Sequence, residues 1–170
     1  MLVLDTGSRD DTVQVARSHG ARVARFAWCD DFSAARNEAL ALAGADWHLV
    51  LDADEWLIEG GEALQALRDT PPSFVGALQL RDRFDLAPER QAEAVAWLSR
   101  VLPGPVRYAG RVHEQPQHAL PVCRLPLVVG HDGYVAERLA HKRGRNRQLL
   151  QQALAEAPDD AYLWYQLGKD

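Results

Sequence analysis

An apolar run that ends in three carboxylates, Leu49-Val50-Leu51-Asp52-Ala53-Asp54-Glu55, is the feature that most constrains this chain. Such a run is typical of a buried strand that delivers its last side chains to a ligand site. Side chains two residues apart on an extended strand point to the same side, so Asp52 and Asp54 can converge on one ligand. A hard divalent cation, Mg²⁺ or Mn²⁺, would normally lie between two such carboxylates. The alternative is a strand end whose aspartates cap a following turn.

The first fifty residues alternate strand and helix patterns. Strands are expected at residues 1–4, 21–26 and 46–51, and helices between Asp10 and Gly20 and at about 32–43, with Asp10 and Asp31 as N-caps. This alternation predicts an α/β fold with a parallel sheet and crossover helices. Ligands of such sheets bind beyond the carboxyl ends of the strands, where Asp5, Asp52 and Asp54 all fall.

The second half of the chain has a different pattern. A helix is expected at 60–69, strand-like segments at 74–84 and 94–102, and helices at about 137–157 and 161–168. Because Gly and Pro turns, and no clear helix, separate the two strand-like segments, we expect an antiparallel extension that carries a second substrate.

Composition excludes several classes of protein. The chain has 170 residues, the size of one domain, and a net charge of −5 with scattered arginines, which argues against a nucleic-acid binder. Every apolar run is too short to span a membrane, so no transmembrane segment is expected. Cys29 and Cys123 fit no metal-binding spacing, and reduced thiols in a cytoplasmic protein are the expectation.

Two polar clusters in the second half contain histidines. One holds the pair His113-Glu114, and the other, Gly130-His131-Asp132-Gly133-Tyr134, follows an apolar run. An isolated histidine more often has a structural role than a ligand role, since only a second converging group makes a site. The presence of two such clusters favours a functional role for at least one of them.

Four segments together resemble family 2 glycosyltransferases of the GT-A fold. They are Leu4-Asp5-Thr6-Gly7-Ser8-Arg9-Asp10-Asp11-Thr12, Asp30-Asp31-Phe32-Ser33-Ala34-Ala35-Arg36-Asn37, Leu51-Asp52-Ala53-Asp54-Glu55 and Gly110-Arg111-Val112-His113-Glu114. The resemblance implies a GT-A-like domain at residues 1–135. Residues 136–170 are expected to form a helical tail whose end resembles the start of a tetratricopeptide repeat, which some members of the subgroup carry. The resemblance to family 2 glycosyltransferases also implies a further strand and helix ahead of the Asp5 strand, and we expect this chain to lack them.

The resemblance implies roles for the nucleotide-sugar site. Asp5 would hydrogen-bond the base, Asp52 would lie near the ribose and the metal, and Ser8 and Arg36 would belong to the nucleotide-sugar site. Asn37 would support the helix that carries Arg36.

The resemblance also implies a metal centre. Asp54 would bind Mn²⁺ or Mg²⁺, which holds the diphosphate of the sugar donor, and His131 would supply a late metal or diphosphate contact. The metal would stabilise the charge that develops on the departing nucleoside diphosphate.

A base for the acceptor hydroxyl is needed if the transfer inverts the sugar configuration. Glu114 is the candidate, because it follows an apolar-to-polar switch where the family places its catalytic acid. Three other residues are rivals for this role: His113, Asp82 and Asp132.

The sequence therefore predicts a metal-dependent glycosyltransferase that uses a nucleotide-diphosphate sugar and an unknown acceptor. Two alternatives stay open at this point. One is a truncated, non-catalytic module that acts as a scaffold. The other is a D-x-D phosphatase, which is disfavoured because Lys142 and Lys169 are the only lysines and the Asp52 strand does not come first.

Overall fold

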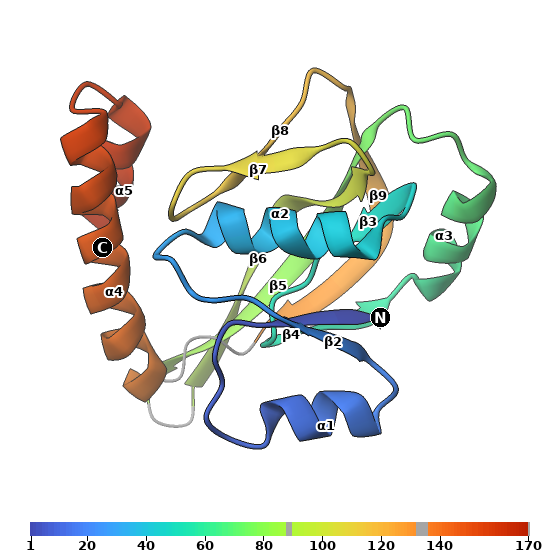
Figure 1. Ribbon diagram of the computed structural model, residues 1–170, viewed down its shortest axis with the longest axis horizontal. Helices are drawn as coiled ribbons and strands as arrows, with labels where there is room; N and C mark the ends of the chain where they lie inside the picture. Colours follow the sequence, from blue (N-terminus) through green and yellow to red (C-terminus); the bar gives the residue numbers. More distant parts are fainter. Residues whose placement is uncertain (88–89, 132–135, 170) are drawn as a thin grey trace. The chain divides into compact units, whose positions relative to one another are not determined.

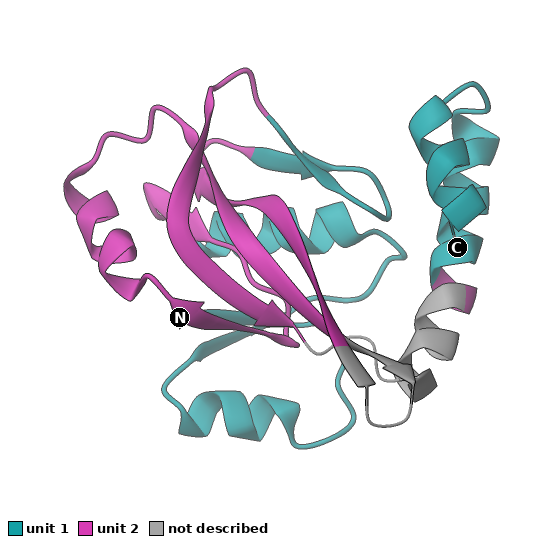
Figure 2. Ribbon diagram, turned by 180° about the vertical axis from the view of Figure 1, so that it is seen from behind, with its two compact units in different colours: residues 1–44, 107–117, 146–170 teal, residues 45–106, 118–145 magenta. Residues whose placement is uncertain are grey.

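The computed structural model describes residues 1–87, 90–131 and 136–169. The chain divides into two compact units (Figure 2). Unit 1 contains residues 1–44, 107–117 and 146–170, and unit 2 contains residues 45–106 and 118–145. The predicted domain boundary after residue 135 lies outside the described residues and stays a prediction.

Unit 1 begins with the expected strand–helix–strand pattern. Strands β1 (Leu2–Asp5) and β2 (Arg22–Arg25) pair in parallel, and α1 (Thr12–Ser18) connects them (Figure 1). The N-cap position is Asp11 and not Asp10 as predicted, and the Asp11 side chain makes no capping hydrogen bond. The Asp10 carboxylate instead accepts hydrogen bonds from the amide and hydroxyl of Thr12, the first helical residue.

Helix α2 (Phe32–Ala43) starts where the sequence predicts. The Asp31 carboxylate accepts a hydrogen bond from the Ala34 amide at 2.9 Å, which satisfies one of the amides that the first helical turn leaves unpaired, and another from the Ser33 hydroxyl at 2.8 Å. The helix ends at Gly44, whose left-handed conformation favours glycine.

The rest of unit 1 consists of a short hairpin and the C-terminal helices. Strands β7 (Arg107–Ala109) and β8 (Gln115–Gln117) are antiparallel. Helix α4 (Ala136–Glu156) belongs to unit 1 only from residue 146 onward, and α5 (Ala161–Lys169) follows it. Apolar side chains from these segments form one cluster, with Val112, Leu149 and Leu150 buried at its centre. No helix in the described part of the chain is long and apolar enough to cross a membrane.

Unit 2 is a five-stranded sheet in the order β3-β6-β5-β9-β4. Its elements are β3 (Trp47–Leu49), β4 (Glu55–Glu59), α3 (Gly61–Ala66), a 3₁₀ turn (Leu67–Asp69), β5 (Val75–Ala87), β6 (Arg90–Pro103) and β9 (Val122–His131). Strands β5 and β6 form the expected antiparallel extension, and β5 pairs with β9 in parallel. Leu78, Leu127 and Val129 are fully buried in the core of this unit.

The expectation that the strand near residue 50 belongs to the parallel sheet is wrong. Strand β3 pairs antiparallel with β6, whereas β1 and β2 form a sheet of their own. The physical reason is that the long strand β6 offers the backbone groups of β3 a complete antiparallel ladder.

Gly60 provides a test of the packing in unit 2. Its backbone has a φ of +90°, and a Cβ at this position would lie 1.8 Å from the carbonyl oxygen of Pro126. Gly60→Ala should therefore lower the free energy of unfolding by ~3 kcal/mol or more, from left-handed strain plus a backbone clash. Gly20→Ala is the control, because Gly20 has a φ of +78° with nothing within 4 Å, and its cost should be about 1–2 kcal/mol.

Denaturant unfolding followed by circular dichroism measures both variants. Equal losses in Gly60→Ala and Gly20→Ala would contradict the close approach of Gly60 to the Pro126 carbonyl.

Candidate functional site

The acidic segment that dominates the sequence lies in a turn. Strand β3 ends at Leu49, the Val50 amide still donates to the Arg100 carbonyl, and the Glu55 amide donates to the Asp52 carbonyl at 3.0 Å. Asp52 and Asp54 are therefore not alternate residues of one extended strand, and the alternation argument for their convergence is wrong. The chain reverses between them to enter β4, so each carboxylate has its own surroundings.

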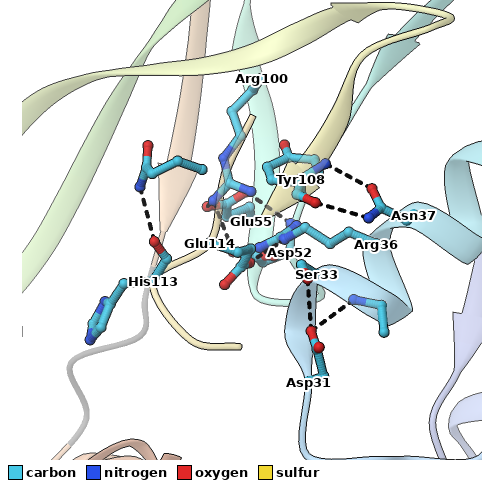
Figure 3. Close-up of polar contacts among 12 residues, drawn as sticks. Asp31, Ser33, Arg36, Asn37, Asp52, Glu55, Arg100, Tyr108, His113 and Glu114 are labelled. Carbon is cyan, nitrogen blue, oxygen red and sulfur yellow. Dashed lines mark hydrogen bonds and ion pairs between the residues drawn. The ribbon is translucent and has the colours of Figure 1, made fainter. Parts of the chain in front are cut away.

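Arg100 and Glu55 hold the turn in place (Figure 3). Arg100 Nη2 lies 2.9 Å from Asp52 Oδ2 and 3.1 Å from Glu55 Oε1. The other Glu55 carboxylate oxygen accepts the Asp52 amide at 2.9 Å. These three contacts close a ring, so the turn is fixed by a charge-assisted network as well as by the backbone.

Glu55 is the most buried carboxylate of this ring, with its side chain 3% exposed. Burial raises the pKa of Glu55, and the nearby Asp52 charge adds to this effect, while the Arg100 guanidinium opposes it. The Arg100 guanidinium is thus shared by two carboxylates. Ionisation of Glu55 therefore costs more free energy in the folded protein than in the unfolded chain.

His131 lies at the end of β9, between β4 and β5. It pairs with Glu55 of β4 and with Asp82 of β5 in the ladder register. Its Nδ1 contacts Asp82 Oδ1, and its Nε2 lies 3.3 Å from Asp54 Oδ2. The structure therefore brings together the two residues predicted to bind metal, Asp54 and His131.

The residues around His131 fit a divalent cation. Asp54 offers a carboxylate oxygen and His131 a ring nitrogen, at side-chain exposures of 25% and 17%. Among the described residues, no group of three or more His, Cys, Asp or Glu side chains is arranged to hold a metal ion, so the protein would supply only these two ligands. Such a donor set suits an ion whose other ligands are waters or substrate phosphates, and the imidazole nitrogen suits Mn²⁺ better than Mg²⁺.

The electrostatics of unit 2 also favour a cation here. Four acids gather around the turn and the end of β9: Asp52, Asp54, Glu55 and Asp82. The guanidinium of Arg100 contacts two of them, and His131 contacts the other two. A bound divalent cation would reduce the repulsion among these carboxylates.

Asp5 and Ser8 come together in unit 1. Asp5 is buried at the end of β1, and its Oδ1 accepts the Ser8 amide at 3.0 Å. Hydrogen bonds from the Ser8 side chain and amide lower the pKa of Asp5 below its usual value. The loop after β1 thus presents an acceptor-only carboxylate that can receive a hydrogen bond from a ligand N–H.

Glu114, the predicted base, forms an ion pair with Arg36 within unit 1 (Figure 3). The Glu114 side chain is 9% exposed, and the Arg36 guanidinium also lies 5.3 Å from the centre of the Tyr108 ring. The neighbouring Asn37 side chain donates to the Tyr108 carbonyl at 2.9 Å and accepts its amide at 2.8 Å. Asn37 thus ties α2 to β7, which agrees with its predicted supporting role.

Two of the three rival candidates for the base have contacts that the structure describes. His113 has a φ of +53°, and its carbonyl accepts hydrogen bonds from Gln115 and from the Tyr162 hydroxyl. Asp82 is engaged with His131, and Asp132 lies outside the described residues.

Sequence reasoning missed two residues of this site. Arg100 is one arginine among many on a strand, and no local pattern distinguishes it. Glu55 directly follows Asp54 and begins strand β4. Its position at the start of a strand was the signal in the sequence that its side chain is buried.

The mixed α/β structure is that of the GT-A fold class. Residues 1–119 match the family model described as Glycosyl transferase family 2. The chain belongs to this family, and the resemblance carried by the four sequence segments is confirmed.

The chain is also similar to two curated proteins. It is 40% identical over 187 aligned positions to a TPR repeat-containing protein of Synechococcus elongatus, covering 99% of this chain and 44% of that protein. It is 26% identical over 180 positions to the SPbeta prophage-derived glycosyltransferase SunS of Bacillus subtilis, covering 100% of this chain and 42% of that protein. The chain therefore spans less than half the length of these curated relatives.

The raised pKa of Glu55 predicts a pH dependence of stability. Near pH 4.5, the ordinary value, Glu55 releases its proton in the unfolded chain but retains it in the folded one, so its contribution to stability falls as the pH rises through the raised folded value. Glu55→Gln has no such ionisation. The stability of the wild type relative to Glu55→Gln should therefore decrease from pH 4 to pH 8.

Urea unfolding of both proteins at several pH values measures this difference. A wild type that gains stability relative to Glu55→Gln as the pH rises would show that the Arg100 ion pair outweighs the burial of Glu55.

Proposed function

We propose that this domain transfers a sugar from a nucleotide-diphosphate donor to an acceptor, with a divalent cation bound by Asp54 and His131. The observation that carries this proposal is the 3.3 Å approach of His131 Nε2 to Asp54 Oδ2 within an acid-rich cluster. Membership of the glycosyltransferase family supports the reaction class. A relative named as a glycosyltransferase supports it further.

The cation would neutralise charge on the departing nucleoside diphosphate. Asp54 and His131 supply its protein ligands, and the ring formed by Asp52, Glu55 and Arg100 keeps the turn in one conformation. Such preorganisation matters because ligands already in place need no rearrangement when charge develops.

The roles expected for nucleotide-sugar binding stay proposals, and each is argued from contacts within its own unit. In unit 1, Asp5 accepts a hydrogen bond from the base, Ser8 holds the Asp5 carboxylate in position, and Arg36 contributes positive charge for the donor. In unit 2, Asp52 contacts the ribose through the carboxylate that Arg100 orients. The contacts within each unit support these roles, because each carboxylate is already held by a donor.

Glu114 is proposed as the base that takes the proton from the acceptor hydroxyl. The Arg36 ion pair orients its carboxylate, and the low exposure of the side chain limits competition from water. The acceptor hydroxyl oxygen would then attack the anomeric carbon as the bond to the diphosphate breaks.

Titration with nucleotide sugars tests the metal-dependent donor site. UDP, GDP and dTDP sugars are titrated into the protein by calorimetry with and without Mn²⁺. At least one donor should bind more tightly with Mn²⁺, and Asp54→Asn should remove this enhancement because the cation loses its carboxylate ligand. Glu59→Gln is the matched control, since it removes an exposed carboxylate from the same unit.

No metal-dependent binding of any donor by the wild type would reject the proposed site. Loss of binding in Glu59→Gln as well would indicate a general charge effect.

Glu114→Gln tests the proposed base. The turnover of a donor that binds the wild type should fall by about 10²–10⁴-fold, while donor affinity changes little, because only proton transfer is lost. Glu156→Gln is the control, since Glu156 is an exposed carboxylate that pairs with an arginine in the same unit. Unchanged turnover in Glu114→Gln would exclude this residue as the base.

A further inference from the structure

We propose that Asp82 is a positioning residue that orients His131, so that Nε2 of the imidazole, and not Nδ1, binds the cation. This inference rests on the proposed function, because it concerns the same metal centre. It adds a residue that does not touch the metal and yet determines whether a nitrogen ligand is available.

The strand register places Asp82 beside His131. In the parallel pairing of β5 with β9, the two residues are direct partners, so their side chains stand on the same face of the sheet. Asp82 Oδ1 contacts His131 Nδ1. Both strands belong to unit 2 and continue into its buried core, so the backbone holds the pair together.

This contact selects one tautomer of the imidazole when a metal is bound. An ionised carboxylate can only accept a hydrogen bond, so the proton lies on Nδ1. The lone pair is then left on Nε2, which faces Asp54 Oδ2 at 3.3 Å. A histidine that binds a metal characteristically donates its other N–H to a carboxylate in this way.

The geometry also argues against Asp82 as a direct ligand or as the base. Its Oδ1 is engaged by Nδ1 of His131, on the side of the ring that faces away from Asp54. The carboxylate that faces Nε2 belongs to Asp54. The order along the site is therefore Asp82, imidazole ring, Asp54, with the cation site at the Asp54 end.

A nitrogen ligand has a consequence for metal preference. Mg²⁺ prefers a shell of oxygen ligands and retains its waters, whereas transition metals accept imidazole nitrogen. If His131 Nε2 binds the cation, the site should favour Mn²⁺ over Mg²⁺, and Asp82 should be needed for much of that preference.

Binding of Mn²⁺ alone tests this proposal without any measurement of activity. Free Mn²⁺ is counted by electron paramagnetic resonance during titration of the wild type, Asp82→Asn, His131→Ala, Asp54→Asn and the control Glu59→Gln. Competition with Mg²⁺ gives the Mn²⁺ to Mg²⁺ affinity ratio. Electron spin-echo modulation detects a nitrogen atom bound to Mn²⁺.

The wild type should show nitrogen coupling and a preference for Mn²⁺. Asp82→Asn should weaken Mn²⁺ binding by about 10–100-fold, reduce the Mn²⁺ to Mg²⁺ ratio and weaken the coupling. His131→Ala should lose the coupling, and Glu59→Gln should match the wild type. A merely structural role for Asp82 would leave the coupling and the affinity ratio unchanged.

The outcomes that overturn the inference differ from those that overturn the proposed function. Mn²⁺ binding that depends on Asp54 but shows no nitrogen coupling, or that Asp82→Asn leaves intact, overturns the role of Asp82 alone. No Mn²⁺ binding by the wild type, with or without a nucleotide sugar, overturns both.

A second measurement needs no substitution, so it holds even if Asp82→Asn does not fold. In the wild type loaded with Zn²⁺, nuclear magnetic resonance of ¹⁵N-labelled histidine should show a proton on Nδ1 of His131 and none on Nε2. A proton on Nε2 would overturn the proposal.

Discussion

The position of His131 at the end of β9 is the constraint on which the candidate site depends. Because β9 lies between β4 and β5, its last residue is the partner of Glu55 on one side and of Asp82 on the other. Backbone ladders fix these pairings, and a shift of one residue would turn the imidazole to the opposite face. The chemistry proposed for the metal centre therefore depends on hydrogen bonds between strands that are distant in sequence.

The second constraint is electrostatic. The guanidinium of Arg100 contacts both Asp52 and Glu55, so two carboxylates share one positive charge. The other two carboxylates, those of Asp54 and Asp82, contact the imidazole of His131. An excess of carboxylates is costly to the folded protein, and the proposed divalent ion would reduce that cost. The cluster of acids at the turn is thus consistent with a cation-binding role. Its buried member, Glu55, has a structural role, because it binds Arg100 and the Asp52 amide.

The sequence predicts the elements of this fold well where periodicity and caps are local. Asp31 caps α2 and Gly44 ends it, and the alternation of strand and helix near the N-terminus gives the parallel pair β1 and β2. The convergence of Asp54 with His131 followed only from the family resemblance, because it depends on strand register. The role of Arg100 was not predictable, since its partners are 48 and 45 residues away in sequence.

The central claim is that Asp54 and His131 bind one divalent cation in this glycosyltransferase family domain. The most direct measurement is a crystal structure of the protein grown with Mn²⁺, with anomalous scattering recorded at the manganese edge. The account predicts one anomalous peak in contact with both Asp54 Oδ2 and His131 Nε2, with Asp82 still bound to Nδ1. A peak held by Asp52 and Asp54 without His131, or no peak at the turn, would contradict it.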